Sequence, residues 1–241
     1  MKASFDARGD VVLVTGGAQG IGGAVAVACA EAGARVVAFD TAAGPGHPGV
    51  QEVRVDVADR AAVTGAVDAV VRQHGRIDAL VAGAAVQPRT PVLETLPADW
   101  RRTLAVNLDG VVWACQAVVP QMVRQRSGAV VVFTSGLAGT GFPAAAGYAA
   151  SKAALVGFAK SLAAEVAEHR VRVNVVSPGV VDTAQFRAAN AGADLDHWRR
   201  TTGVGTVDDV VGPLLFLLSD AATMTGSVLT RERAYPAGAA S

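Results

Sequence analysis

A tyrosine and a lysine four residues apart are the residues in this 241-residue sequence whose types and spacing most directly suggest catalysis. Tyr148 and Lys152 lie in an apolar stretch with helical spacing, and a separation of four places both side chains on one face of a helix. A free phenol has a pKa of about 10, and a neighbouring cation lowers that pKa. The pair is therefore a candidate for general acid–base catalysis by Tyr148 near neutral pH.

Two further polar residues lie upstream of this pair. Ser135 directly follows the apolar run Ala129–Phe133, and its hydroxyl is placed to hydrogen-bond a substrate oxygen and to stabilise charge that develops there. Asn107 lies in a helix-like segment, where asparagine has no propensity advantage. The other interpretation of Asn107 is a structural residue whose amide bonds the nearby backbone.

A glycine-rich turn lies near the N-terminus, between the apolar run Val11–Val14 and the helix-like segment Ile21–Ala32. Gly16, Gly20 and Gly22 let the chain turn tightly, approach a pyrophosphate closely and pack the helix against the strand. The phosphate would lie at the helix N-terminus, where free N–H groups and the helix dipole favour an anion. The alternative is a glycine-rich turn that binds no ligand.

An acidic residue, Asp40, ends the second apolar run, eighteen residues after Gly22. A carboxylate at this place can accept hydrogen bonds from the adenosine ribose hydroxyls and would repel a 2′-phosphate. No Arg or Lys adjoins it in the sequence or lies in the glycine turn. These observations favour NAD over NADP, with a helix N-cap or turn residue as the other interpretation of Asp40.

The remaining sequence alternates short apolar runs with longer helix-like segments, which predicts βαβ units. The runs are continuously apolar, as expected of parallel strands covered on both faces. We therefore expect one α/β domain over 1–241: a Rossmann-like, doubly wound parallel sheet flanked by helices on both faces, with its ligand at the carboxyl ends of the strands. The expected strands are Val11–Val14, Arg35–Phe39, Glu52–Val55, Ala79–Val81, Ala129–Phe133, Arg172–Val176 and Ser227–Thr230, and the expected helices Ile21–Ala32, Arg60–His74, Trp100–Arg124, Ala145–His169 and Thr206–Ser219.

Composition excludes several classes of protein. Hydrophobic residues make up 51% and charged residues 17%, so most of the chain is not disordered. The formal net charge is zero, which argues against a nucleic-acid partner. Cys29 and Cys115 stand apart from any metal-binding pattern and are expected to be small buried hydrophobic residues. We expect no metal, no signal peptide, no membrane span and a cytoplasmic location.

Taken together, these residues resemble the motifs of the short-chain dehydrogenase/reductase family over about residues 8–229. Each motif alone is weak, but their order and spacing agree throughout, so the combination is specific. The matching segments are TGGAQGIG at 15–22, Asp56–Val57, Asn107–Gly110, Ser135, YAASK at 148–152 and Pro178–Thr183.

The resemblance implies an NAD(H)-dependent oxidoreductase that interconverts a secondary alcohol and a ketone. Tyr148 would be the general acid/base, Lys152 would hold the cofactor ribose and lower the pKa of the tyrosine, and Ser135 would orient the substrate oxygen. Asn107 would hold a water that relays protons past Lys152. The cofactor-binding positions implied are Gly16, Gln19, Gly20, Ile21, Gly22, Asp40, Asp56, Val57, Ala82, Gly83, Tyr148, Lys152, Pro178, Gly179, Val181 and Thr183.

Two departures from the family concern the site itself. The family's NNAG segment reads Ala82–Ala85 here, so the asparagine hydrogen bonds that brace this turn are lost. The family serine often precedes a glycine by three residues, and counting back from Gly139 would give Gly136 that position. The spacing from Gly128 and from Tyr148 favours Ser135 instead.

A third departure lies at the C-terminus. The family often ends its last strand with VDGG, whereas this chain reads RERA at 231–234 within a divergent tail over 230–241. That region commonly forms a subunit contact. The altered C-terminus therefore leaves open whether this chain forms the family's usual tetramer. We expect a homo-oligomer, either a dimer or a tetramer.

The stretch 184–203 has the position of the family's substrate-covering loop and carries Phe186 and Trp198. With Phe142 and Arg89, which follow other strands, it suggests a cyclic or moderately bulky small molecule bearing an acidic or polar group. In the other interpretation these aromatic residues only pack the loop against the body. Two functions from other classes also remain: a lyase or epimerase without net redox, and a nucleotide-binding regulatory protein without turnover.

Overall fold

The computed structural model describes residues 4–192 and 195–231, which form a seven-stranded parallel sheet in the order β3-β2-β1-β4-β5-β6-β7. This order confirms the predicted doubly wound α/β sheet, because the chain builds one half outward from β1 and the other outward from β4. The strands are β1 (Val11–Thr15), β2 (Arg35–Asp40), β3 (Val50–Arg54), β4 (Ala79–Ala82), β5 (Gly128–Phe133), β6 (Val171–Ser177) and β7 (Val228–Thr230).

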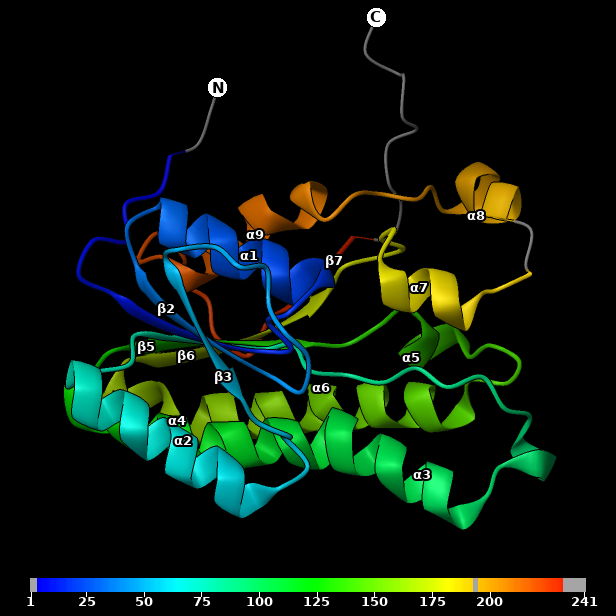
Figure 1. Cartoon of the computed structure of the whole chain (residues 1–241), viewed down its shortest axis with the longest axis horizontal. Helices are drawn as coiled ribbons and strands as arrows, with labels where there is room; N and C mark the ends of the chain where they lie inside the picture. The colour runs from blue at the N-terminus through cyan, green and yellow to red at the C-terminus, as the bar shows by residue number, and fades with distance from the viewer. Residues whose placement is uncertain (1–3, 193–194, 232–241) are drawn as a thin grey trace, which may run out of the picture.

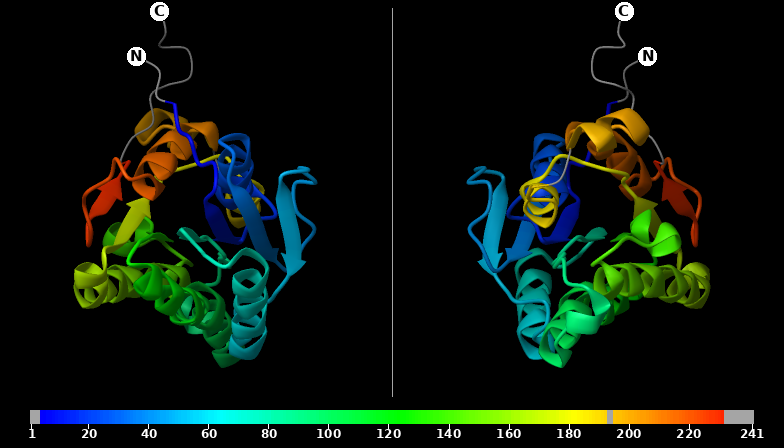
Figure 2. Two further views of the ribbon diagram at one scale, coloured as in Figure 1. Left: turned by 90° about the vertical axis from the view of Figure 1, so that its left-hand side faces the viewer. Right: turned by 90° about the vertical axis from the view of Figure 1, so that its right-hand side faces the viewer.

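Helices cover both faces of this sheet, in two layers with the strands between them (Figures 1 and 2). The layer formed by α1 (Gly20–Glu31) and α9 (Asp208–Leu218) packs on one face, over a core cluster that includes Val14, Val25 and Leu214. The other layer is formed by α2 (Arg60–His74), α4 (Gly110–Gln125) and α6 (Ala146–Val166). Strands β1, β4 and β5 are buried along their whole length, which explains their unbroken apolar sequences.

The strand expected at Glu52–Val55 begins two residues earlier and ends one residue earlier, at Val50–Arg54. It is an edge strand, and only Val50 is fully buried while Gln51, Glu52 and Arg54 are exposed. Because one face of this strand meets solvent, its sequence carries no apolar run that could mark its start.

The long helix expected at Trp100–Arg124 consists of three parts. They are α3 (Pro97–Leu104), the π-helical turn η2 (Ala105–Asp109) and α4, which follow one another without a break. Proline at the first position of α3 supplies the start signal that the prediction placed three residues late. The π-helical turn contains Asn107, and such turns are often found at functional sites.

Several short helices were not predicted. Apart from η3 (Ala167–His169), which ends the helix expected at Ala145–His169, they are η1 (Val92–Glu94), α5 (Leu137–Thr140), α7 (Ala184–Ala189) and α8 (Leu195–Thr201). The last two occupy the stretch 184–203, and Figure 1 shows them beyond the sheet on the side of α1 and α9. Helices of this length have no apolar period long enough to read from sequence. Of the divergent tail over 230–241, residues 232–241 lie outside the described residues.

Both cysteines are buried, with 2% of the surface of Cys29 and of Cys115 exposed, which confirms their prediction as small core residues. Burial also raises the pKa of each thiol to about 12, so neither forms a thiolate at neutral pH.

The continuous helical run 97–125 is long and apolar enough to cross a membrane by length and composition alone, which the sequence analysis did not anticipate. Half of its apolar window is buried in the protein, and α4 packs against the strands with Val118 and Met122 fully buried. These contacts identify α4 as a helix of the core.

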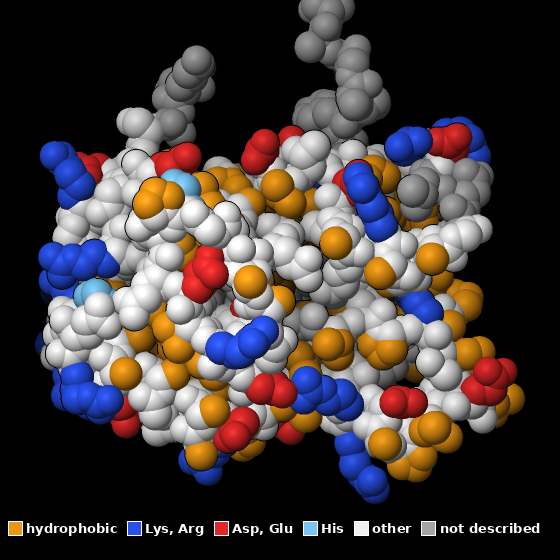
Figure 3. Space-filling view, viewed as in Figure 1, with side chains coloured by type: hydrophobic (Ala, Val, Ile, Leu, Met, Phe, Trp, Pro, Cys, Tyr) orange, Lys and Arg blue, Asp and Glu red, His pale blue; other side chains and the backbone are white. Residues whose placement is uncertain are grey.

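Exposed apolar side chains gather at one end of the molecule, at lower right in the space-filling view of Figure 3. They belong to η1 and the segment around it, where Leu93 is fully exposed and Val92 and Leu96 are more than 60% exposed. A second exposed pair, Val228 and Leu229, lies on the edge strand β7.

Candidate active site

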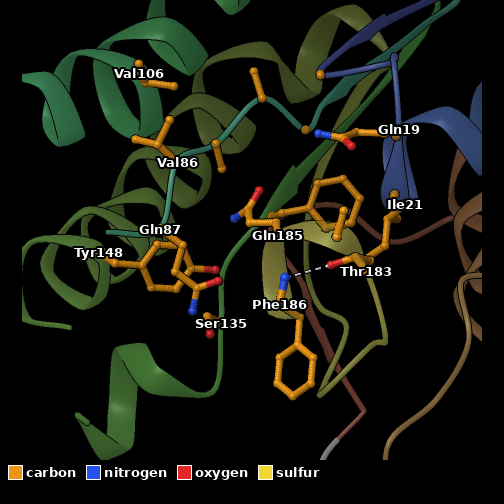
Figure 4. A pocket seen from close by; sticks show the side chains of 18 of the residues that line it. Gln19, Ile21, Val86, Gln87, Val106, Ser135, Tyr148, Thr183, Gln185 and Phe186 are labelled. Atoms are coloured by element: carbon orange, nitrogen blue, oxygen red, sulfur yellow. Dashed lines mark hydrogen bonds between the residues drawn. The ribbon is translucent and has the colours of Figure 1, made fainter. Parts of the chain in front are cut away.

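A cleft of about 430 Å³ lies along the carboxyl ends of the strands, where the fold predicts a ligand. Both halves of the sheet contribute to it. Figure 4 shows Tyr148, Gln87 and Ser135 on one side of the cleft and Gln19, Ile21 and Thr183 on the other. Of the predicted site residues, the cleft is lined by Gly16, Gln19, Gly20, Ile21, Gly22, Asp40, Asp56, Val57, Gly83, Ser135, Tyr148, Lys152, Pro178, Gly179, Val181 and Thr183, whereas Ala82 and Asn107 lie behind this lining.

The side chain of Tyr148 meets that of Ser135 in this cleft (Figure 4). Tyr148 comes from the first turn of α6, and Ser135 lies two residues after the end of β5. Burial raises the pKa of Tyr148, while the hydrogen bond with Ser135 and the charge of Arg89 lower it by smaller amounts. Counting back from Gly139 would have given the family's serine position to Gly136. Gly136 has no side chain, and in the structure the hydroxyl that meets Tyr148 is that of Ser135.

Lys152 lies one turn after Tyr148 and is almost completely buried, with 3% exposed. Its ammonium donates a hydrogen bond to the carbonyl of Phe133 at 3.0 Å and lies 5.8 Å from the centre of the Tyr148 ring. Burial lowers the pKa of Lys152 to about 8. In this ligand-free chain the charge of Arg89 lowers the pKa of Tyr148. The effect expected of Lys152 when the cofactor is bound stays a prediction.

Asn107 is fully buried, and its side chain bonds the backbone of Val86 in both directions, accepting at 2.8 Å and donating at 2.9 Å. Its amide also donates to the hydroxyl of Ser151, which in turn donates to the carbonyl of Tyr148 at 2.7 Å. Both amide hydrogens are therefore used. Asn107 braces the segment after β4 and the turn of α6 that carries Tyr148, which matches its structural interpretation.

The turn after β4, where the family motif is altered, makes two hydrogen bonds to Thr15 of β1. The amide of Gly83 donates to the carbonyl of Thr15 at 3.0 Å, and the amide of Ala84 reaches the hydroxyl of Thr15 at 3.4 Å. Together with the bonds between Asn107 and Val86, these contacts brace the turn and the segment that follows it.

The glycine turn forms an open cradle at the start of α1. Gln19 is the N-cap residue and makes no side-chain capping bond, and the first turn of α1 contains no acidic residue. A side chain at Gly22 would collide with the carbonyl of Gly16, and one at Gly16 would collide with Ala84, so both positions require glycine. The free N–H groups of the first turn therefore open onto the cleft, as an anion-binding site requires.

The other end of the cleft is lined by Asp40, Asp56 and Val57. One oxygen of Asp40 accepts from the amide of Ala18 and the other from that of Ala42, both at 3.0 Å. These bonds make Asp40 a turn residue as well as a residue of the cleft. They also tie the glycine turn to the end of β2.

Two arginines near this end were missed by the sequence analysis. Arg54 is paired in register with Asp40 across β2 and β3 and donates to the carbonyl of Thr41, and Arg102 lines the cleft in an ion pair with Asp56 at 3.1 Å. The expectation that no cation adjoins Asp40 holds only along the sequence. Sheet pairing brings Arg54 to it from fourteen residues away, and no local sequence signal marks that pairing.

The segment Pro178–Thr183 follows β6 and borders the middle of the cleft. The hydroxyl of Thr183 accepts from the amide of Phe186 at 3.1 Å and so caps α7 (Figure 4). From the divergent C-terminal end, the guanidinium of Arg231 donates to the carbonyl of Pro178 and pairs with Asp209 of α9. Arg231 thus fixes this segment from behind.

Aromatic residues cover the outer part of the cleft beside Tyr148. The ring of Trp198 lies 5.5 Å from that of Phe142 and 6.2 Å from that of Phe186, centre to centre. The guanidinium of Arg89 lies over the Phe142 ring at 4.7 Å. The covering stretch therefore does pack against the body, and Phe186, Trp198 and Arg89 line the cleft at the same time.

These residues fit a nicotinamide dinucleotide by their chemistry. The glycine cradle and the uncapped start of α1 suit a pyrophosphate, Asp40 suits ribose hydroxyls, and the buried Tyr148 and Lys152 suit a reaction that transfers protons. No group of three or more His, Cys, Asp or Glu side chains that could hold a metal ion gathers among residues 4–192 and 195–231.

Comparison with known proteins identifies the family. The family model described as short chain dehydrogenase matches residues 10–194. The D-threitol dehydrogenase of Mycolicibacterium smegmatis is 39% identical over 239 residues, covering 93% of this chain and 92% of that protein. The 2,3-dihydro-2,3-dihydroxybenzoate dehydrogenase of Escherichia coli is 37% identical over 233 residues, covering 91% and 93%.

A solved structure agrees with these sequence relatives. The ligand-free aldohexose dehydrogenase of Thermoplasma acidophilum superposes with a TM-score of 0.89 at 29% identity and covers 95% of this chain and 94% of that chain. The chain therefore belongs to the short-chain dehydrogenase/reductase family of oxidoreductases, as its sequence motifs predicted.

Because the charge of Lys152 is buried, replacing this lysine by an apolar residue should stabilise the ligand-free protein, whereas most core substitutions destabilise a protein. The unfolded chain keeps a lysine pKa of 10.5 and the folded chain one of about 8, so the unfolded chain binds more protons between these pH values. The free energy of unfolding therefore rises with pH across that window, and below it the protein bears the full cost of the buried charge, about 3 kcal/mol.

Lys152→Met should accordingly raise the free energy of unfolding at pH 7 without cofactor by about 1–2 kcal/mol, after the lost hydrogen bond to Phe133 is subtracted. Urea unfolding at pH 7 and at pH 9.5 measures this gain, which should shrink at the higher pH. Lys160→Met, at an exposed position of the same helix, is the control and should change little. A Lys152→Met protein less stable than the wild type at pH 7 would contradict the buried-charge argument.

Proposed function

We propose that this protein is an NAD(H)-dependent oxidoreductase that interconverts a secondary alcohol and a ketone on a cyclic or moderately bulky small molecule. The observation that carries the proposal is the convergence of Ser135, Tyr148 and Lys152 on the cleft that also contains the glycine cradle. The bound nicotinamide would supply or accept the hydride, and the protein supplies position and electrostatics.

Tyr148 carries the proton. In ketone reduction its phenol protonates the carbonyl oxygen, and in alcohol oxidation its phenolate removes the hydroxyl proton. Ser135, which already meets the phenol, donates a hydrogen bond to the same substrate oxygen and stabilises its developing charge. Because burial raises the pKa of Tyr148 in the ligand-free chain, the phenol form prevails at neutral pH and suits reduction.

Lys152 holds the cofactor ribose in this proposal, and its ammonium is fixed toward the cleft by the carbonyl of Phe133. Asn107 acts mainly as a positioning residue, because its amide hydrogens are engaged by Val86 and Ser151. The family resemblance implies that Asn107 also takes part in a proton relay. It would do so through its main chain or the remaining lone pair of its amide oxygen.

Preference for NAD over NADP rests on Asp40, whose carboxylate lies where the adenosine ribose would bind and would repel a 2′-phosphate. Arg54 and Arg102 lie at the same end of the cleft and favour NADP as the second candidate. Arg54 is turned to the carbonyl of Thr41 and Arg102 to Asp56, so both are already engaged.

The substrate class is supported by the aromatic cover formed by Phe142, Phe186 and Trp198, which suits a ring. The names of the relatives describe dehydrogenases of a polyol, D-threitol, and of a cyclic diol acid, 2,3-dihydro-2,3-dihydroxybenzoate.

We further propose a cytoplasmic homo-oligomer, dimer or tetramer, to which the exposed apolar edge of β7 at Val228 and Leu229 would contribute.

Replacing the phenol tests the proposed acid–base role. Tyr148→Phe should leave NADH binding nearly unchanged while turnover of a ketone substrate falls by about 10²–10⁴-fold, the scale of general acid–base catalysis. Fluorescence titration measures the binding and NADH absorbance the turnover. Turnover in the variant comparable to that of the wild type would remove Tyr148 from the mechanism. Product formation with no net change in NADH would indicate a lyase or epimerase instead.

Replacing the carboxylate tests the cofactor preference. Asp40→Ala should weaken NADH binding and bring the dissociation constants of NADH and NADPH closer by about tenfold, because the repulsion of the 2′-phosphate is removed. Titration of both cofactors into wild-type and variant protein measures this. Asp68→Ala, which removes a carboxylate from an exposed position of α2 outside the cleft lining, is the control and should leave the ratio unchanged. An unchanged ratio of the two constants in Asp40→Ala would make Asp40 a turn residue only.

A further inference from the structure

Arg89 is a cation of the cleft that the proposed reaction does not use. Arg89 lies in the loop after β4, lines the cleft and is half-buried with its guanidinium over the ring of Phe142. Its charge acts on Tyr148 and lowers the pKa of the phenol. The guanidinium therefore belongs to the same cleft as Tyr148, beside the aromatic ring of Phe142.

Arg89 has no acidic partner in the described part of the chain. Its Nε donates to the carbonyl of Ala189 at 3.2 Å and its Nη2 to the side chain of Asn190 at 3.3 Å, both at the end of α7. Its Nη1 is buried and has no hydrogen-bond acceptor among the described residues. Burial lowers the pKa of Arg89, and the phenolate form of Tyr148 would oppose this effect.

The incomplete hydrogen bonding of the Arg89 guanidinium is unfavourable unless a bound ligand supplies the missing acceptors. A guanidinium offers five N–H donors, and a partly buried cation with long bonds to neutral acceptors and one unpaired nitrogen is poorly compensated. Arg102, the other arginine among the described residues that line the cleft, differs because it pairs with Asp56. The group that best satisfies a planar guanidinium is a carboxylate, through two parallel charge-assisted hydrogen bonds.

We propose that Arg89 is the anchor for a carboxylate on the substrate, so that the enzyme acts on cyclic hydroxy acids and the corresponding oxo acids. The inference rests on the redox function proposed above and narrows its substrate class. The ring would lie against the aromatic cover, with its reacting oxygen at Ser135 and Tyr148 and its carboxylate at Arg89. The carboxylate would take the place of one of the two long hydrogen bonds to α7, to Ala189 or to Asn190.

A matched pair of ligands tests the anchor without turnover. Calorimetry in the presence of NADH compares cyclohexanecarboxylate with the neutral cyclohexanecarboxamide. The wild type should bind the carboxylate about 10- to 100-fold more tightly than the amide, and Arg89→Gln should bring this ratio close to one. Arg187→Gln removes the same charge from an exposed position of α7 and should keep the wild-type ratio.

Turnover separates the two proposals. With 4-oxocyclohexanecarboxylate and its amide as substrates, the wild type should prefer the acid through a lower KM, and Arg89→Gln should lose that preference while Arg89→Lys retains part of it. A wild-type ratio near one, or an Arg89→Gln protein that weakens both ligands equally, would overturn the anchor. Binding of the carboxylate that depends on Arg89, with no oxidation of NADH, would support the anchor and count against the redox function.

Discussion

The hydrogen bonds that fasten α6 to the end of β5 are the interactions on which the rest of the site depends. Lys152 donates to the carbonyl of Phe133, and the hydroxyl of Thr134 donates to the carbonyl of Lys152 at 2.8 Å. The strand then continues directly to Ser135, and the helix carries Tyr148 one turn earlier. These two buried bonds therefore fix the serine and the tyrosine against each other, although thirteen residues separate them in the sequence.

The protonation states of Tyr148 and Lys152 depend on opposing effects of burial and of neighbouring groups in the cleft. Burial raises the pKa of Tyr148 and lowers that of Lys152, so each group is pushed toward its neutral form. Arg89 and the hydrogen bond with Ser135 oppose this effect at the tyrosine. The state of the phenol thus depends on residues from two loops, those after β4 and β5, and ligands that bring charge near Arg89 would alter it as well.

The sequence was sufficient to predict the sheet, its two helical layers and the residues at the strand ends, because buried parallel strands leave continuous apolar runs and loops at one edge meet in space. It was not sufficient where pairing is non-local. The register that sets Arg54 against Asp40, and the buried bonds of Asn107 to Val86, depend on tertiary packing. The short helices α7 and α8 were missed because one or two turns leave no periodic signal.

The most direct test of the account is the fate of the hydride. The purified protein would be mixed with NADH deuterated at the nicotinamide C4 on both faces and a panel of cyclic ketones with and without a carboxylate, and the products analysed by mass spectrometry. Hydride transfer from NADH to the carbonyl carbon predicts oxidation of NADH and one deuterium on the carbon that bore the carbonyl. Bound NADH that no ketone oxidises, or a product without deuterium, would contradict it.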